Sequence, residues 1–317
     1  MPSKTSLSVR IKAYTEALEL RRKYGWGNRT IAAHVGLPYP TVNSWMVGRH
    51  SPFGSCNVPR LGPSRPLSYL AGALLGDGSM IRSPSYHYEM RFRVRDFEFA
   101  ERVCDCAISV LRKQKSVKLD NKGFYEVRFW SRLLYEYLSD WSQIRKCAGE
   151  FPAEFVRGFA DAEGSPAVSL WQSSSPMFGF YVVLVSTNLR ILHYIKDLLQ
   201  TQFGIGSYIL LGRKRRSMWS KRPWYYLKIG RRQDQLRFAR RIGFGLYRKQ
   251  QKMEIALSLL ETRSLSQAAS GWRKLFQKHG RNWVFSEPAK KIWSPGRDLN
   301  SRPLPVCLGY QGNALGC

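Results

Sequence analysis

The sequence predicts an α+β protein made of two similar halves, each with the element order αββαββα, behind a small all-α domain at the N-terminus. Two stretches predict the duplication, LAGALLGDG at 70–78 and VRGFADAEG at 156–164, which stand about 86 residues apart. Each places small residues in an apolar helix that ends in an acid followed by glycine. Alternating apolar and polar residues, which are typical of strands, follow both stretches.

Residues 1–48 are predicted to form the all-α domain. A helix-like stretch covers 13–24, and GNRTIAAHVGLPYPTVNSWMVG after it resembles a helix-turn-helix. We expect Thr30 to cap a short helix, Gly36 to form the turn, and Val42 to pack the second helix against the first. A three-helix unit without DNA contact is the alternative interpretation. The exposed positions of the second helix, which would contact the major groove of DNA, are Tyr39, Thr41, Asn43 and Ser44.

The first half is predicted over 66–148, after a linker at 49–65 that is rich in Pro, Gly and Ser. Its first helix is the motif at 70–78. The further elements expected in this half are a hairpin over 79–95, a helix over 97–113, a second hairpin over 116–130 and a helix over 132–141.

The second half is predicted over 149–262 and repeats this order. The elements expected after its motif helix are strands over 165–171 and 178–186, a helix over 188–203, strands over 206–213 and 224–230, and helices through Leu236 and Lys252. Residues 263–317 are a C-terminal extension. Its last part, 293–317, has many prolines and glycines and no periodicity, so we expect it to be loosely ordered.

Composition sets the class of partner. The 317 residues include 51 Lys and Arg against 22 Asp and Glu, a formal charge of +29 that is spread along the chain and predicts a polyanion as partner. No apolar run reaches membrane-spanning length and the N-terminus has no signal-peptide layout, so we expect no membrane contact and a cytoplasmic, nucleoid-associated location. The six cysteines lack paired CxxC spacing and are predicted to be reduced.

Basic side chains on predicted strands and loops indicate a surface for DNA. In YEMRFRVR, three arginines alternate with apolar residues and share one face, where they would repel one another without a polyanion opposite. The loop over 212–223 joins two strands and carries six cationic side chains. The predicted DNA contacts outside the N-terminal domain are Arg91, Arg93, Arg95, Arg128, Arg213, Lys214, Arg215, Arg216, Lys221, Arg222 and Lys228.

Small residues give each motif helix a face without bulk. Gly72 and Gly76 stand four apart in the first motif, and Gly158 and Ala162 stand four apart in the second. Residues at this spacing lie on the same side of a helix. The two helices are therefore predicted to pack side by side, backbone against backbone.

The last acid of each motif, Asp77 or Glu163, stands one residue before a glycine. We expect the helix to stop there and the chain to leave in a left-handed turn. Side-by-side packing of the helices would bring both carboxylates out at the same end. Two carboxylates held together in so basic a protein predict a site for a hard divalent cation such as Mg²⁺.

This doubled motif resembles the LAGLIDADG homing endonucleases, specifically the single-chain type with two motifs, and the resemblance covers about 66–260. It implies that the two sheets form a saddle over double-stranded DNA around a pseudo-twofold axis, in a monomer. It also implies that Asp77 and Glu163 are catalytic, and that they hold Mg²⁺ or Mn²⁺ with help from Gly76 and Ala162. The implied reaction is a double-strand cut with 3′ overhangs in a long, asymmetric site.

One departure from the family concerns a lysine that members often keep near each acid. The corresponding places hold Arg95 and Thr187. Arginine contacts phosphate but is a poor base, and threonine does neither task as well. The side chains that would position water or contact phosphate are Arg95, Gln172, Ser186, Thr187 and Asn188.

Two alternative functions belong to other classes. Some proteins with these motifs help an intron RNA to fold as maturases, and a basic saddle can hold structured RNA as well as DNA. Others, joined to a helix-turn-helix, are transcription regulators that have lost the acids. The presence of both Asp77 and Glu163 argues against a pure regulator and leaves the maturase open.

Overall fold

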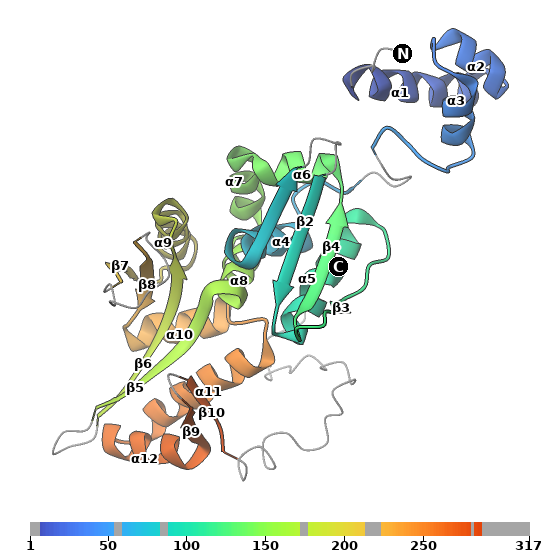
Figure 1. The fold of residues 1–317 in the computed structure, drawn as a ribbon. Helices are drawn as coiled ribbons and strands as arrows, with labels where there is room; N and C mark the ends of the chain where they lie inside the picture. The colour runs from blue at the N-terminus through green and yellow to red at the C-terminus, as the bar shows by residue number, and fades with distance from the viewer. Residues whose placement is uncertain are drawn as a thin grey trace, which may run out of the picture. The chain divides into compact units, whose positions relative to one another are not determined.

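The computed structural model describes residues 7–53, 59–82, 88–171, 177–212, 223–279 and 282–286. Contacts divide the chain into two compact units, one of Met1–Ala167 with Phe180–Leu257 and one of Val168–Gly179 with Ser258–Cys317. The first unit contains the N-terminal helices and both motif helices (Figure 1). Within the described residues, no helix is long and apolar enough to cross a membrane.

Three short helices form the N-terminal part of the first unit: α1 (Leu7–Tyr24), α2 (Asn28–His34) and α3 (Tyr39–Met46). Their shared core includes Ile31, Val42 and Trp45. Gly36 makes the turn between α2 and α3 with a φ of 65°, as expected of a turn glycine. The capping prediction was wrong, because α2 starts at Asn28 and Thr30 lies inside it. The three-helix arrangement is present, and contact of α3 with DNA stays a prediction.

The first half follows the predicted order through its two hairpins. Its elements are α4 (Arg65–Asp77), β1 (Gly78–Arg82), β2 (Tyr88–Val94), α5 (Phe97–Leu111), β3 (Lys118–Leu119), β4 (Tyr125–Trp130), α6 (Arg132–Ser139) and α7 (Trp141–Glu150). The strands form one antiparallel sheet of order β1-β2-β4-β3. The α7 helix was not predicted.

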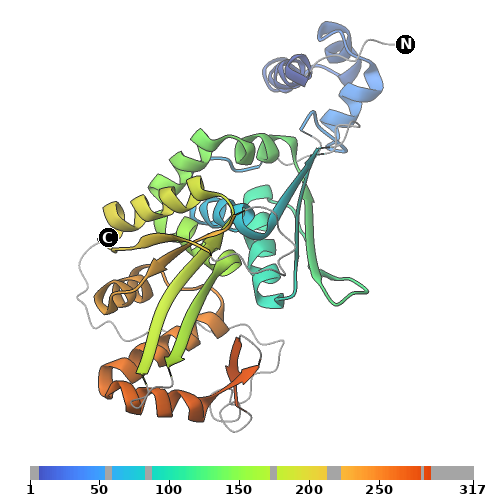
Figure 2. The ribbon, with the colours of Figure 1, turned by 60° about the vertical axis from the view of Figure 1, so that its left-hand side comes forward.

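Alternation along β2 decides which face of the first sheet is buried. Met90, Phe92 and Val94 are buried, whereas the arginines between them are partly or fully exposed. The α5 helix packs on β2 and β4 at the buried face, as Figure 2 shows in teal and green. Asp96 accepts a hydrogen bond from the Phe99 backbone N–H at 3.3 Å and so caps α5 at its start.

The second half has the same sheet order. Its elements are α8 (Pro152–Glu163), β5 (Gly164–Trp171), β6 (Met177–Ser186), α9 (Leu189–Phe203), β7 (Tyr208–Leu211), β8 (Tyr225–Ile229), α10 (Arg232–Arg241) and α11 (Tyr247–Thr262). The strands are ordered β5-β6-β8-β7, which matches the first sheet element by element. The predicted duplication of the fold is therefore confirmed.

The motif helices α4 and α8 pack extensively on each other (Figure 1). A Cβ placed on Gly72 would fall on the Phe155 carbonyl, and one on Gly158 would fall on the Tyr69 carbonyl. The contact is reciprocal, since Phe155 stands to Gly158 as Tyr69 stands to Gly72 in sequence. This is the local twofold relation that the repeated small residues predicted.

The glycine that follows each acid does not have the predicted left-handed conformation. Gly78 has a φ of −84° and Gly164 a φ of −94°, so the chain runs directly from helix into extended strand. A Cβ would lie 2.7 Å from the Leu74 Cα at Gly78 and 2.8 Å from the Ala160 Cα at Gly164. These glycines are needed because the strand leaves close to the last helical turn, and not because of their φ.

The second unit contains α12 (Leu265–Leu275) and the hairpin of β9 (Phe276–His279) and β10 (Asn282–Phe285). Stacked aromatic rings form its interior, with Trp272 and Phe276 centroids 3.9 Å apart and Phe285 against Phe276 at 4.4 Å. Ser264 caps α12 through a reciprocal capping box with Gln267. The extension thus begins with ordered structure, and the predicted loose tail at 293–317 lies outside the described residues.

Candidate active site

The paired helices bring the two predicted catalytic acids to one end. Gly76, one residue before Asp77, faces the end of α8: a Cβ there would lie 2.5 Å from the Ala162 Cβ and 3.0 Å from the Glu163 Cγ. Asp77 is exposed and Glu163 is partly buried. In the part of the chain that the structure describes, no donor forms a hydrogen bond or ion pair with either carboxylate. Both are free to bind something that is positively charged.

The electrostatics of the pair disfavour two bare negative charges. Loss of hydration and then the charge of Asp77 raise the pKa of Glu163 to about 6. Loss of hydration also raises the pKa of Asp77, and the positive charge of the nearby Lys249 ammonium partly offsets this rise. A divalent cation would relieve this repulsion, because it favours the ionised form of both groups.

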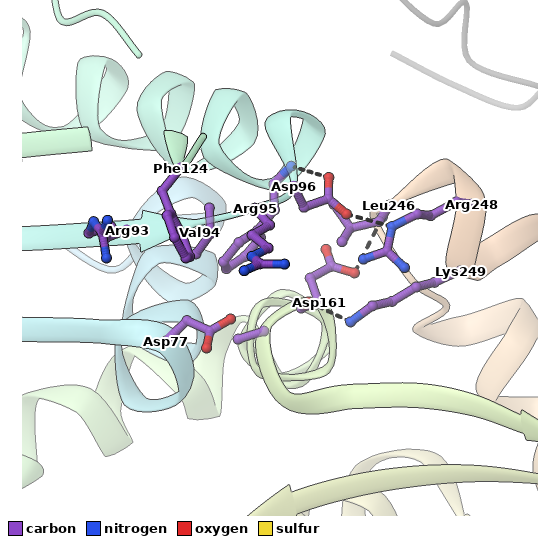
Figure 3. Close-up of a pocket in the computed structure, with 12 residues that line it drawn as sticks. Asp77, Arg93, Val94, Arg95, Asp96, Phe124, Asp161, Leu246, Arg248 and Lys249 are labelled. Atoms are coloured by element: carbon purple, nitrogen blue, oxygen red, sulfur yellow. Dashed lines mark hydrogen bonds and ion pairs between the residues drawn. The ribbon is translucent and has the colours of Figure 1, made fainter. Parts of the chain in front are cut away.

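A pocket of about 320 Å³ opens beside Asp77 (Figure 3). Several of its charged groups come from other parts of the chain: Arg95 and Asp96 lie between β2 and α5, and Arg248 and Lys249 come from the first turn of α11. Arg248 donates to Asp96 over 2.5 Å and so ties α11 to the start of α5. The Asp77 carboxylate therefore faces cationic side chains from both halves of the chain.

Lys249 is a site residue that the sequence analysis missed. Its ammonium is buried and donates hydrogen bonds to the carbonyls of Ala160, Asp161 and Gly164, at 3.1, 2.6 and 2.7 Å. It thereby binds backbone carbonyls at the junction of α8 and β5, where the positive charge also interacts favourably with the C-terminal end of the helix. Burial lowers the pKa of Lys249 to about 8. The available signal was its spacing from buried Met253, four residues later, which places a lysine on the apolar face of α11.

Asp161 fixes the loop that precedes α11. Its carboxylate is buried and accepts hydrogen bonds from the Tyr69 hydroxyl at 2.7 Å and from the backbone N–H of Gly245 at 2.8 Å and Leu246 at 3.3 Å. Burial raises the pKa of Asp161, and its hydrogen bond from Tyr69 acts in the opposite direction. By holding residues 245 and 246 against α8, Asp161 positions Lys249 a few residues later.

A second pocket, of about 360 Å³, opens beside Glu163. Ser186, Thr187 and Asn188 line it, together with apolar side chains and Trp224. Two of these polar groups serve local structure: the Ser186 hydroxyl accepts from the Asn188 N–H at 3.0 Å, and the Asn188 side chain caps α9. All three lie where the sequence placed them, at the end of β6 beside the acid. Gln172 lies outside the described residues.

The predicted arginine face of the first sheet exists, but three of its arginines, Arg91, Arg93 and Arg128, are paired with acids. Arg91 and Arg128 both bind Glu126, Arg128 at 2.7 Å, and Arg93 binds Asp120 at 2.6 Å. The argument that these side chains would repel one another without a polyanion was therefore wrong, because acidic groups on the neighbouring strand and turn neutralise them. Contact with DNA by this face stays a prediction.

The other predicted DNA contacts lie on the second sheet, on α3 and in the loop between β7 and β8. Lys228 lies over the Tyr181 ring at 3.2 Å from its centroid, on the second sheet. On α3, Tyr39 is exposed beside Arg29, and the Asn43 side-chain oxygen accepts from Asn28 at 2.9 Å. Thr41 and Ser44 are partly buried. The loop residues that lie outside the described structure are Arg213, Lys214, Arg215, Arg216, Lys221 and Arg222.

The residues present fit a divalent cation that keeps most of its ligands from water or substrate. No cluster of three or more His, Cys, Asp or Glu side chains suited to a metal occurs among the described residues. Asp77 and Glu163 would supply two carboxylate oxygens. Magnesium and manganese are bound in this way, by one or two carboxylates with waters and phosphate oxygens. The predicted part of the Gly76 and Ala162 carbonyls stays a prediction.

Comparison with known proteins gives one family-model match, in the second half, and one similar protein. Residues 150–243 match the family model of a LAGLIDADG-like domain. An uncharacterized protein of Methanocaldococcus jannaschii is 25% identical over 244 residues, which cover 73% of this chain and 86% of that protein.

Solved structures with similar folds include two homing endonucleases. I-DmoI in complex with DNA and Mn is 18% identical and has a TM-score of 0.42, over 56% of this chain and 96% of that one. I-SmaMI bound to uncleaveable DNA is 13% identical and has a TM-score of 0.43, over 62% of this chain and 91% of that one.

The two matching halves and their paired motif helices define an α+β protein with a duplicated fold. The family model of a LAGLIDADG-like domain matches the second half of the chain, and the first half repeats the same motif and sheet order. The family model therefore supports, over residues 150–243, the resemblance inferred from the doubled motif.

Proposed function

We propose that this protein is a divalent-metal-dependent DNA endonuclease that cuts both strands of a long, asymmetric site and leaves 3′ overhangs. The observation that carries the proposal is the meeting of Asp77 and Glu163 at the ends of α4 and α8, with no described donor on either carboxylate. A pure regulator would have no need for such a pair. The formal charge of +29 supports DNA as the substrate.

Asp77 and Glu163 are the residues that would hold Mg²⁺ or Mn²⁺. When bound, such a cation supplies a water of lowered pKa and neutralises charge on the phosphate. Arg95 would contact a phosphate oxygen; its exposed guanidinium, which lines the pocket beside Asp77, supports this role. Lys249 stabilises the end of α8 through three carbonyls and so keeps Glu163 in place.

Binding to DNA would come from parts of the chain that do not touch the acids. The arginine face of β2 and β4, and Lys228 on β8, would lie along the duplex, and the ion pairs with Glu126 and Asp120 would exchange for phosphate contacts. The exposed side of α3 would extend the site if the N-terminal helices bind the major groove. A nucleoid-associated, monomeric protein is part of the proposal.

The test separates binding from cutting. Duplexes from a random pool are first selected for binding to the protein without metal, and the selected pool is then cloned, exposed to Mg²⁺ and sequenced at any cut ends. Wild type is compared with the Asp77→Asn/Glu163→Gln double variant, and one arm contains EDTA. Cuts at one long motif by the wild type alone, with 3′ overhangs, are expected. Bound but uncut DNA in Mg²⁺ and in Mn²⁺ would reject the endonuclease and favour a regulator or maturase.

A further inference from the structure

The exposed faces of the two sheets differ in charge. In both halves the second, fourth and third strands lie next to one another, so that side chains of one face form rows across them. The row one residue before the end of β2 consists of Arg93, Glu126 and Lys118. The row one residue before the end of β6 consists of Val185, Tyr226 and Leu210. Three charged side chains of the first sheet thus correspond to three uncharged ones of the second.

The next row along the strands shows the same difference. In the first sheet it pairs Arg91 with Arg128. In the second sheet it consists of Val183, Lys228 and Tyr208, of which only Lys228 is charged. The Lys228 ammonium lies 3.2 Å from the centroid of the Tyr181 ring, so aromatic carbon packs against this charge as well. The uncharged members of the two rows form an apolar face that consists of Val183, Val185, Tyr208, Leu210 and Tyr226.

The apolar face is continuous with the candidate active site. Val185 lines the pocket beside Glu163, and so does Trp224, the residue before β8. The Trp224 ring lies against that of Tyr226, with the two centroids 5.8 Å apart. Arg93, which corresponds to Val185, lines the pocket beside the other acid. A duplex with a phosphate at Glu163 would therefore have its next base pairs over the apolar face.

The major groove of DNA offers such a face one kind of apolar group, the C5-methyl group of thymine. The other groups on the base edges are hydrogen-bond donors and acceptors, and the phosphates bind cations. Rows that contain a single lysine have little to offer a run of phosphates. The aliphatic and aromatic carbon of the apolar face is within reach of a ligand, because Tyr208 and Leu210 are exposed and the other three members are partly buried. The chemistry of this face therefore favours methyl groups.

We infer that the apolar face recognises a thymine-rich half of the DNA site by contact with the C5-methyl groups. This inference rests on the proposed function, and it names the sequence class of one half of the substrate. The first sheet presents arginine and glutamate at the corresponding places, so its half of the site has no such dependence on the methyl group. The asymmetry of the site would then come from a difference in side-chain chemistry between two sheets of the same topology.

Replacement of thymine by uracil tests the contact directly, because it removes the methyl group and keeps the base pairing. The site recovered by binding selection is made with uracil in place of single thymines, first in one half and then in the other. Affinity for the full-length protein is measured by gel shift without Mg²⁺. We expect binding to weaken about fourfold for each methyl group that the protein contacts, in one half only. Equal responses in the two halves, no response in either, or a selected site without thymine would overturn the inference.

Leu210→Asn tests whether the apolar face causes the response. The variant should lose the response to uracil at one or more of the thymines that matter in the wild type. The matched control is Leu211→Asn, the next residue on the same edge strand, whose side chain points to the opposite face. Both side chains are exposed, so both variants should fold, and circular dichroism checks this. The same response at every thymine in Leu210→Asn as in the control would overturn the inference.

A second variant, Val183→Thr, keeps the shape of the side chain and replaces one methyl group by a hydroxyl on β6. It should likewise reduce the response at one or more thymines, and it decides the test should Leu210→Asn not fold. An unchanged response in that case would overturn the inference.

These outcomes are distinct from failure of the proposed function, because the response to uracil is measured by binding. A wild type that binds the selected site and cuts neither strand in Mg²⁺ or Mn²⁺ would reject the endonuclease, whatever its response to uracil. A wild type that cuts the site but binds the uracil duplexes equally well would keep the endonuclease and reject only the thymine contact.

Discussion

The two halves of this protein share a backbone plan and differ in the side chains beside their acids. Both sheets have the strand order first, second, fourth, third, and both motif helices run directly into the first strand. Yet Asp77 lies beside Arg95, Arg248 and Lys249, and Glu163 lies beside Thr187 and other neutral groups. A duplicated fold thus positions two equivalent acids without giving them equivalent surroundings.

A second difference lies within the motifs themselves. The residue two places before the acid is Leu75 in α4 and Asp161 in α8. Leu75 is partly exposed, whereas Asp161 is buried and binds the loop before α11. The second half therefore anchors the helix that completes the first half's pocket. The asymmetry between the halves therefore extends from the two pockets to the buried contacts of α8.

Substitution of Asp77 or Glu163 should have the largest effect on double-strand cleavage. These variants test whether one acid is enough. Asp77→Asn or Glu163→Gln should each lower the rate of double-strand cleavage at least about a thousandfold, because a carboxylate ligand of the cation is lost. Affinity measured by gel shift should change less than about threefold, since binding comes mainly from basic surfaces. Asp197→Asn, on the exposed side of α9, is the control. Full double-strand activity in either acid variant would remove the proposed site.

Substitutions at the contact between α4 and α8 should have the next largest effect. The loss of stability should be the same whichever of the two helices is changed. Gly158→Val and Gly72→Val each place a side chain on a carbonyl of the opposite helix, so each should lower the free energy of unfolding by at least about 3 kcal/mol. Gly149→Ala on α7 is the matched control, because a Cβ there meets nothing within 4 Å. Urea denaturation measures all three. Two unequal losses at the seam would contradict the local twofold.

Asp161→Leu makes the second motif like the first at this position. It leaves the Tyr69 hydroxyl and the N–H groups of residues 245 and 246 without their acceptor, so unfolding should become easier by about 2 kcal/mol. Leu75→Ala, on a partly exposed side chain of α4, should cost less. Thermal melts of the two variants give the comparison, and an unchanged melt for Asp161→Leu would show that the loop is held by other contacts.

Lys249→Met asks whether α11 of the second half supports the acids. The variant loses three hydrogen bonds to carbonyls but also relieves a buried charge, so the net loss of stability should be only about 1 kcal/mol. The rate of cleavage should fall by more than this loss of stability explains, because Glu163 stands at the end of α8 that Lys249 holds. Lys252→Met, one turn further along α11, is the control. If the rate of cleavage fell equally in Lys249→Met and Lys252→Met, Lys249 would have no specific role in supporting the acids.

The smallest effect is expected from the N-terminal helices, which have no counterpart in either half. Deletion of residues 1–49 should weaken DNA binding by about tenfold or less and reduce the salt dependence by about one unit per lost phosphate contact. The rate of cleavage at saturating protein should not change. Titrations at several salt concentrations provide the measurement. An unchanged affinity and salt slope would assign α1–α3 a purely structural part.

The sequence alone determined the duplicated fold, the two motif helices and the pair of acids. Small residues four apart and period-two alternation are local patterns, and each dictates which face of an element is buried whatever its neighbours are. Hence Gly72 and Gly158 at the seam, and Met90 and Phe92 inside the first sheet, lie as predicted. Helices α7 and α12 lack so clear a pattern and were missed.

Only the tertiary structure decided what surrounds the acids. The ion pair of Arg91 with Glu126 depends on strand register, and the hydrogen bonds of Lys249 depend on how α11 returns to α8 after some 85 residues. The conformation of Gly78 depends likewise on the strand that leaves the helix. Such contacts join residues far apart in the chain, and their energies depend on burial and exact placement, which composition and spacing do not encode.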